Sequence, residues 1–93
     1  MAVTVAPQPG DGPLSAKGPT VDLTVTTTAG ATMTASILTP DGDYLPIDEM
    51  ALATGKERVT LSLPPGGVPP GSKLILVFDE TDGTESFVKY TLK

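Results

Sequence analysis

The last twenty residues, LILVFDETDGTESFVKYTLK, constrain the fold more than any other part of the chain. Residues 74–78 are an unbroken apolar run of β-forming side chains, and residues 87–92 alternate between apolar and polar types. The acidic segment between them contains Asp82-Gly83, a pair typical of tight turns. We therefore predict a closing β-hairpin and an all-β fold. Because residues 74–78 are apolar on both faces, they should form a central strand.

The same alternation recurs upstream. Residues 21–26, 32–37 and 58–63 each place apolar side chains at every second position, as half-buried strands do. Turn-forming residues separate these runs, and the segment PPGGVPPGS at 64–72 predicts a stiff loop that crosses from one sheet to another. About seven short strands, with turn signals roughly every 8–12 residues, are typical of an antiparallel β-sandwich.

Residues 44–54 give an ambiguous signal. Residues 44–47 are compatible with a short strand, which Pro46 would place at a sheet edge. The spacing of Ile47, Met50 and either Ala51 or Ala53, with acids at the front of the segment, also approximates a helical repeat. A single helical turn or short helix over residues 47–54 is therefore the alternative.

The first nineteen residues differ in composition from the rest. They hold four prolines and three glycines, which favour an extended arm over a central strand. We divide the chain into an N-terminal arm, residues 1–19, and a sandwich domain, residues 20–93. Two alternatives stay open for the arm: a floppy terminus or a first edge strand followed by a loop, or a segment that lies on a partner. The candidate partner-binding residues of the second alternative are Val3, Val5, Pro7, Pro9, Pro13 and Leu14.

The residue types that are missing exclude several functions. The 93-residue chain contains no His, Cys, Trp or Asn. It lacks the usual general base near neutral pH, the usual nucleophile and the usual soft metal ligands, so we expect no enzymatic activity and no cofactor. A net charge of −5 with scattered bases disfavours nucleic acid. No apolar run approaches a membrane span, and MAVTVAPQPG lacks the features of a secretory signal.

The acidic residues and two Ser–Lys pairs are the remaining candidates for chemistry. The acids form two clusters: Asp41, Asp43, Asp48 and Glu49, and Asp79, Glu80, Asp82 and Glu85. Neither cluster has the spacing of a calcium loop, so we interpret both as turn-forming and solubilising, and expect no metal. Ser15 with Lys17, and Ser72 with Lys73, lie in Pro/Gly-rich segments without an oxyanion partner, and we interpret them as loop residues.

Five segments carry a resemblance to a known family: VDLTVTT, TPDGDYL, RVTLSLPPG, PGSKLILVF and FVKYTLK. Over residues 20–93 the chain resembles an immunoglobulin-like β-sandwich of the bacterial or bacteriophage kind. It has neither the Cys…Trp…Cys set of antibody domains nor a tyrosine corner, so the similarity is to a looser group that includes fibronectin III-like domains. The resemblance implies adhesion, display or spacing between other parts.

These observations favour a non-catalytic structural or interaction protein. The leading hypothesis is a bacteriophage virion component, a capsid decoration or head/tail accessory protein that docks through its N-terminal arm. It implies a protein partner in a larger assembly such as a capsid, and leaves a homo-oligomer open. The alternative is a protein- or carbohydrate-binding module of a larger bacterial surface or secreted protein, located outside the cell or on its surface. The irregular PPGGVPP loop disfavours a designed sandwich.

Overall fold

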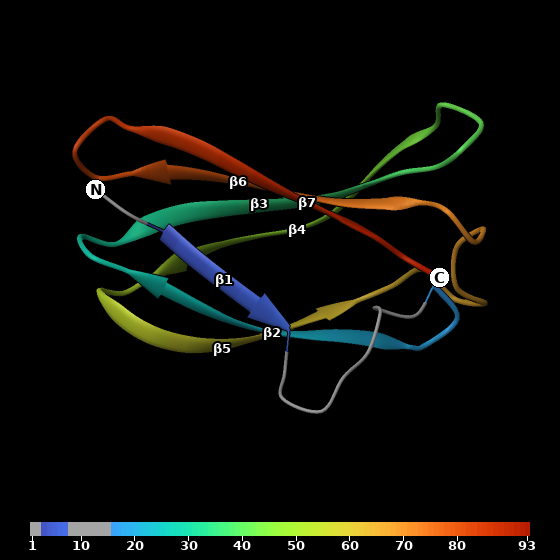
Figure 1. The fold of residues 1–93 in the computed structure, drawn as a ribbon, viewed down its shortest axis with the longest axis horizontal. Helices are drawn as coiled ribbons and strands as arrows, with labels where there is room; N and C mark the ends of the chain where they lie inside the picture. The colour runs from blue at the N-terminus through green and yellow to red at the C-terminus, as the bar shows by residue number, and fades with distance from the viewer. Residues whose placement is uncertain (1–2, 8–15) are drawn as a thin grey trace.

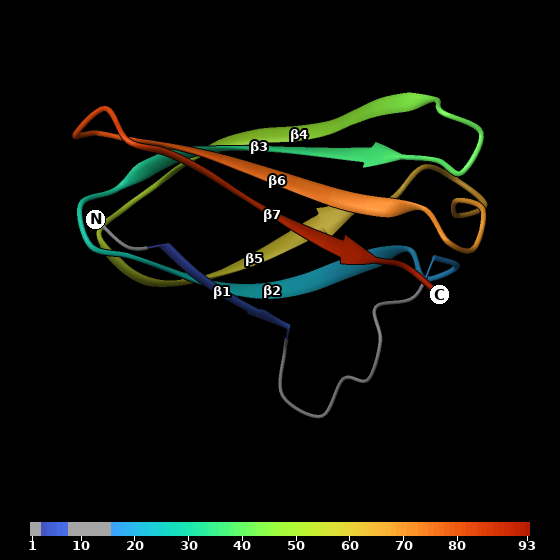
Figure 2. The ribbon, with the colours of Figure 1, turned by 45° about the horizontal axis from the view of Figure 1, so that its top comes forward.

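The fold consists of two antiparallel β-sheets that face each other (Figures 1 and 2). The computed structural model describes residues 3–7, as backbone, and residues 16–93, and these contain strands and loops without a helix. The strands are β1 (Val3–Pro7), β2 (Thr20–Thr27), β3 (Ala31–Leu38), β4 (Tyr44–Leu52), β5 (Gly55–Ser62), β6 (Lys73–Glu80) and β7 (Glu85–Thr91). One sheet has the order β1-β2-β5 and the other the order β4-β3-β6-β7. The prediction of an all-β protein with two packed sheets is confirmed.

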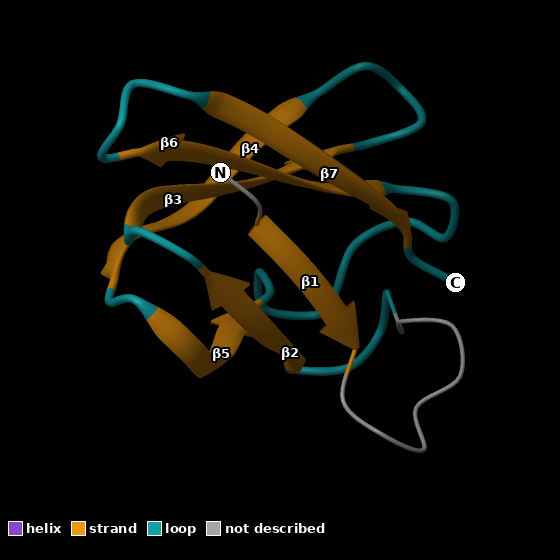
Figure 3. Cartoon of the chain, turned by 60° about the vertical axis from the view of Figure 1, so that its left-hand side comes forward, coloured by secondary structure: helices purple, strands orange, loops and turns teal. Residues whose placement is uncertain are grey.

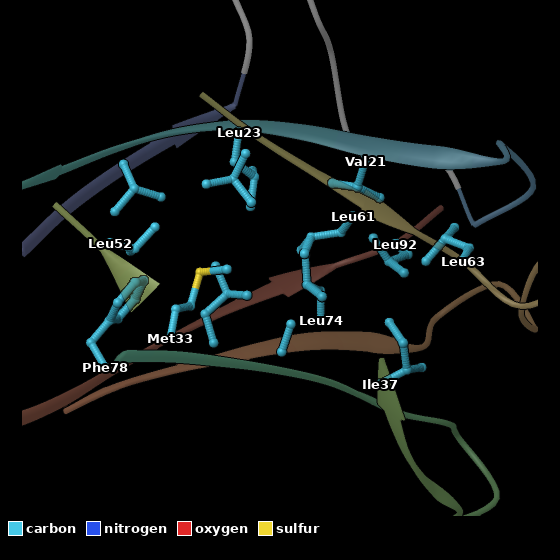
Figure 4. Packing of buried hydrophobic residues seen from close by; sticks show 14 of the residues in the cluster. Val21, Leu23, Met33, Ile37, Leu52, Leu61, Leu63, Leu74, Phe78 and Leu92 are labelled. Atoms are coloured by element: carbon cyan, nitrogen blue, oxygen red, sulfur yellow. The ribbon is translucent and has the colours of Figure 1, made fainter. Parts of the chain in front are cut away.

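The core lies between the sheets and is built by the predicted alternation. In β2, Val21 and Leu23 are buried against Leu61 of β5, while Asp22 between them is exposed on the outer face. Met33 of β3 and Phe78 of β6 enter the core from the opposite sheet and are fully buried (Figure 4). Because successive side chains of a strand point to opposite faces, a period of two in the sequence is enough to assign each face.

Strand β6 occupies the interior position that its composition predicts. It lies between β3 and β7, with residues 74, 76 and 78 facing the core and fully buried. Ile75 and Val77 point to the outer face of the sheet and are half-buried there. An apolar run on both faces therefore marks a strand with neighbours on both edges.

The closing hairpin is confirmed, and its turn geometry occurs twice. In the β6–β7 turn the Gly83 N–H donates to the Glu80 carbonyl at 2.9 Å. In the β3–β4 turn the Gly42 N–H donates to the Thr39 carbonyl at 3.0 Å. Both glycines have a positive φ, +90° for Gly83 and +96° for Gly42, which side chains with a Cβ rarely adopt. The Asp-Gly pairs thus supply the backbone conformation that each turn requires.

Strand β4 corrects the predicted helical turn at residues 47–54. The chain there is extended and pairs with β3 along its whole length, from Tyr44 to Leu52. The register shifts between Ala35 and Ser36 of β3, because Ile47 is an extra residue without an opposite partner. Such a bulge changes the period of two locally, so Ile47 and Met50 reach the core side although they are three positions apart. The bulge therefore gives the apolar residues of β4 a spacing that resembles the repeat of a helix.

The segment from Leu63 to Ser72 crosses from β5 of one sheet to β6 of the other, as predicted. Its turns are closed by the Gly67 N–H to the Pro64 carbonyl at 2.9 Å and by the Ser72 N–H to the Pro69 carbonyl at 3.1 Å. Val68, between these turns, is buried in the core. The loop is thus fixed by its own hydrogen bonds and by one apolar anchor.

Candidate interaction site

The predicted partner-binding residues begin in an edge strand. Val3, Val5 and Pro7 belong to β1, which pairs antiparallel with β2 from Val3 opposite Thr27 to Pro7 opposite Leu23. This agrees with the alternative in which the segment forms a first strand. Because β1 ends its sheet, one of its two backbone edges has no strand beside it among the described residues (Figure 3). Pro9, Pro13 and Leu14 lie outside the described residues.

Ala16, the first described residue after residues 8–15, attaches the chain to the rest of the domain. Its side chain is fully buried in the core. Its N–H donates to the Lys93 carbonyl, and its carbonyl accepts from the Val68 N–H, both at 2.8 Å. The backbone of one residue therefore joins the N-terminal segment to Lys93, which follows β7, and to the crossing loop. Ala16 already belongs to the core, while the boundary between residues 19 and 20 stays a prediction.

The β3–β4 turn, with Asp41 and Asp43, and the β6–β7 turn, with Asp82, lie at opposite ends of the sandwich (Figure 1), whereas Asp48 and Glu49 lie within β4. In the described part of the chain no three His, Cys, Asp or Glu side chains gather closely enough to hold a metal ion. Asp82 instead organises its own turn: its Oδ1 accepts from the Thr84 N–H at 2.9 Å. This hydrogen bond is the main reason why the pKa of Asp82 lies below its ordinary value of 3.8.

The Ser72–Lys73 pair has a structural explanation. The Ser72 hydroxyl is buried and donates to the Pro69 carbonyl at 2.6 Å, so its proton is used within the loop. Lys73 begins β6 and is exposed. The Ser72 hydroxyl is therefore held in a buried hydrogen bond within the loop, whereas the Lys73 side chain is exposed to solvent. Ser15 lies outside the described residues, so its pairing with Lys17 stays without a structural description.

The outer face of the three-stranded sheet is polar. A shallow depression there is lined by Asp22, Arg58, Val59 and Thr60. The Thr60 hydroxyl donates to Asp22 Oδ1 at 2.8 Å across the β2–β5 pair. Such cross-strand hydrogen bonds stabilise a sheet. The depression offers neither the apolar lining nor the enclosure of a small-molecule pocket.

The outer face of the four-stranded sheet is more apolar than that of the three-stranded sheet. It was not predicted from the sequence as a candidate surface. Phe87 of β7 exposes 64% of its surface beside half-buried Val77. The Lys89 ammonium lies 5.6 Å from the centre of the Phe87 ring, a cation–π geometry. The alternation at residues 87–92 could have assigned Phe87 to either face. The hairpin register decides it, because Phe87 is opposite Val77 and not opposite a core residue.

Two buried polar groups were also missed. Glu80 exposes only 5% of its surface, and neither carboxylate oxygen has a hydrogen-bond partner. It continues the inward positions of β6, two residues after Phe78 and opposite buried Ala31. The Ser86 hydroxyl is likewise buried without a partner. The acidic composition of residues 79–85 suggested exposure for every member, whereas strand alternation turns Glu80 inward.

The fold is an all-β domain of two sheets, each of which ends in edge strands. No protein-family model matches the chain, and no curated protein matches it. Among the described residues there is no helix with the length and apolarity that crossing a bilayer requires.

Proposed function

We propose that this is a non-catalytic structural or interaction protein that docks on a larger protein assembly through its N-terminal segment. The observation that carries the proposal is the position of β1. It holds three of the six candidate residues and lies at the edge of its sheet. An edge strand presents unpaired N–H and C=O groups, to which an extended segment of a partner can add.

The sandwich itself is immunoglobulin-like in this proposal. The strand order supports it, because β2 pairs with β5 in one sheet while β3 pairs with β6 in the other. Immunoglobulin-like sandwiches connect their two sheets in this Greek-key manner. With β4 beside β3, the order is of the type found in fibronectin III-like domains. Such a fold supports many functions, so the function has to rest on surfaces and not on the fold.

The assembly that we favour is a bacteriophage virion, in which the protein would be a capsid decoration or a head/tail accessory component. Support comes from the resemblance of residues 20–93 to sandwiches of that kind and from the acidic composition, with a net charge of −5. A small domain that acts by display needs a larger body on which to be displayed. The N-terminal segment, tied by β1 and by Ala16, supplies an attachment that leaves the rest of the sandwich projecting.

The proposal is tested by binding to purified particles that lack the protein. A variant in which Pro9, Pro13 and Leu14 are replaced by alanine leaves β1 and Ala16 in place, so it separates docking from folding. We expect it to lose most of its occupancy, as should a truncation of residues 1–15, which retains Ala16. Asp41→Ala, in the turn at the β3–β4 connection, is the matched surface control.

Occupancy that is unchanged in both N-terminal variants would refute docking through this segment. Circular dichroism and urea unfolding establish that the variants remain folded. If the particles bind none of the proteins while a glycan or a bacterial surface protein binds all of them equally, the module alternative replaces the virion proposal.

A further inference from the structure

One edge of β7 is open, and the hydrogen bonds of the hairpin show which residues face it. At the turn, the Glu80 N–H donates to the Thr84 carbonyl at 2.8 Å. At the far end, the Leu92 N–H donates to the Ser72 carbonyl, also at 2.8 Å. Even-numbered residues of β7 therefore bond to β6. In an antiparallel pair the intervening residues point their N–H and C=O groups the other way.

The groups that face the open edge belong to Glu85, Phe87, Lys89 and Thr91. No strand of the described chain pairs with them, because β7 ends the order of its sheet. Beyond the end of β7, the Ala16 N–H donates to the carbonyl of residue 93. That contact follows the same alternation and marks the limit of the open stretch. A complete row of donors and acceptors is therefore available to another strand.

The edges of β4 and β5 carry features that discourage pairing. Strand β4 has a bulge at Ile47 and a proline at position 46. The outer edge of β5 begins with a glycine and three charged residues, GKER. Strand β7 contains no proline and pairs with β6 in unbroken register from Glu85 to Thr91. Bulges, prolines and charges are the usual protection of an edge, and β7 has only isolated charges.

The charges on β7 are arranged symmetrically about an aromatic ring. Glu85, Phe87 and Lys89 lie on one face of the strand, the outer face of the sheet, opposite Asp79, Val77 and Ile75 of β6. Phe87 is 64% exposed at the centre of this series. Glu85 and Lys89 form no ion pair with another described residue, and the Lys89 ammonium is held near the Phe87 ring. Along β7, the side chains on the outer face are therefore negative, aromatic and positive in turn.

We propose that the β7 edge is a self-association surface that pairs antiparallel with β7 of a second copy, with the two-fold axis at Phe87. In this register Glu85 lies opposite Lys89 of the second copy, and Lys89 opposite its Glu85. The two Phe87 rings meet at the axis. Each of these positions is a hydrogen-bonded pair, because its backbone groups face the edge. Opposite charges and aromatic pairs placed directly across two strands stabilise the pairing.

Only one register satisfies the series. A shift by two residues places Glu85 opposite Phe87 or opposite Thr91, so its charge loses its partner. A shift by one residue brings groups already bonded to β6 to the interface, where they have no bonds to give. When residues 85–89 run antiparallel to the same residues of a second copy, each charge thus meets its opposite. An isologous dimer requires such self-complementarity, whereas binding of a foreign strand does not, so we take a second copy as the occupant.

The experiment measures the oligomeric state of the full chain by sedimentation velocity at concentrations up to ~1 mM, which covers weak interfaces. We expect a monomer–dimer equilibrium. Glu85→Lys and Lys89→Glu each place like charges opposite one another at both symmetry-related pairs, and each should raise the dimer Kd by about tenfold. The double exchange Glu85→Lys with Lys89→Glu recreates both pairs in reverse and should restore the Kd to within about threefold.

Two controls match these changes in net charge. Asp41→Lys in the β3–β4 turn corresponds to Glu85→Lys, and Lys56→Glu in β5 corresponds to Lys89→Glu. Neither control lies on the β7 edge, so neither should change the Kd by more than about twofold. Higher salt should weaken the wild-type dimer, because the charge pairs are exposed. Thermal unfolding of every variant shows whether it is folded.

Three results would overturn the proposal. The first is a wild-type chain that stays monomeric over the whole concentration range. The second is a dimer that the two single variants leave unchanged, since its interface must then lie elsewhere. The third is a folded double exchange that fails to recover what the single variants lose, because the register at Phe87 would then be incorrect. This test involves no particle and no N-terminal variant, so it is decided separately from the docking proposal.

Discussion

Gly67→Ala tests how firmly the N-terminal segment is tied to the rest of the domain. Gly67 has a φ of +80°, and a Cβ added there would lie 2.5 Å from the Ala16 carbonyl oxygen and 3.0 Å from the Lys17 Cα. Both contacts are with backbone, which cannot rotate away. Gly66 is the matched control: its φ is +83°, and a Cβ there would meet nothing within 4 Å. Comparing the stabilities of the two variants therefore separates the effect of the clash from the effect of the positive φ.

The magnitude follows from the contacts that the clash must break. Both substitutions place an L-residue in the left-handed region, which costs about 1–2 kcal/mol. Only Gly67→Ala must also displace Ala16, whose backbone makes two hydrogen bonds, to Lys93 and from Val68. At about 0.5–1.5 kcal/mol each, their loss adds roughly 1–3 kcal/mol. A difference of ~2 kcal/mol corresponds to a midpoint about 8–16 °C lower than that of Gly66→Ala.

The assay is urea and thermal unfolding followed by far-UV circular dichroism. Tyrosine fluorescence is a second probe, because the chain contains two tyrosines and no tryptophan. Coincident transitions by the two probes would justify a two-state free energy of unfolding. If the two variants unfold within about 0.5 kcal/mol of each other, Ala16 is not held as described, and the reasoning about the anchored N-terminal segment fails.

Three further predictions concern single groups. Glu80→Leu should raise the free energy of unfolding by about 1–3 kcal/mol in urea at neutral pH, because it removes a buried carboxylate without hydrogen bonds; a loss of stability would contradict this. Thr27→Val should lower the free energy of unfolding by about 1 kcal/mol, since its buried hydroxyl donates to the Ala53 carbonyl; an unchanged midpoint would be evidence against that bond. The Asp82 carboxyl should titrate below 3.8 by NMR, because the Thr84 N–H stabilises its charged form, so the stability it contributes is present above its ordinary pKa and disappears as the pH falls through the lowered one; a midpoint at or above 3.8 would show that the turn hydrogen bond is not made.

The sequence predicted the fold wherever one face of a strand packs against the core. Residues 21–26 and 74–78 illustrate this, because burial alone decides which of their side chains point inward. The turn at Asp82-Gly83 was predictable for a different reason, namely the positive φ that its glycine supplies. Both rules are local, so they need no knowledge of which strands become neighbours.

The misses arose where the outcome depends on a partner strand. The bulge at Ile47 exists only in relation to the register with β3, so residues 47–54 looked helical in isolation. Glu80 is buried because strand alternation continues to the last residue of β6, into what looked like an acidic turn. The open edge of β7 is likewise a property of sheet order. Candidate surfaces of this kind can be derived only once strands are placed beside one another.

The placement of the chain ends has a mechanical consequence. The start of β1 and the C-terminal end of β7 lie at opposite ends of the long axis (Figure 1). Tension between them would pull β1 along β2, and β7 along β6, parallel to the strands. Because antiparallel hydrogen bonds run perpendicular to the strands, such tension shears a whole ladder at once and does not open it bond by bond. A chain held by its N-terminal segment and loaded at its other end would resist force along its strongest direction.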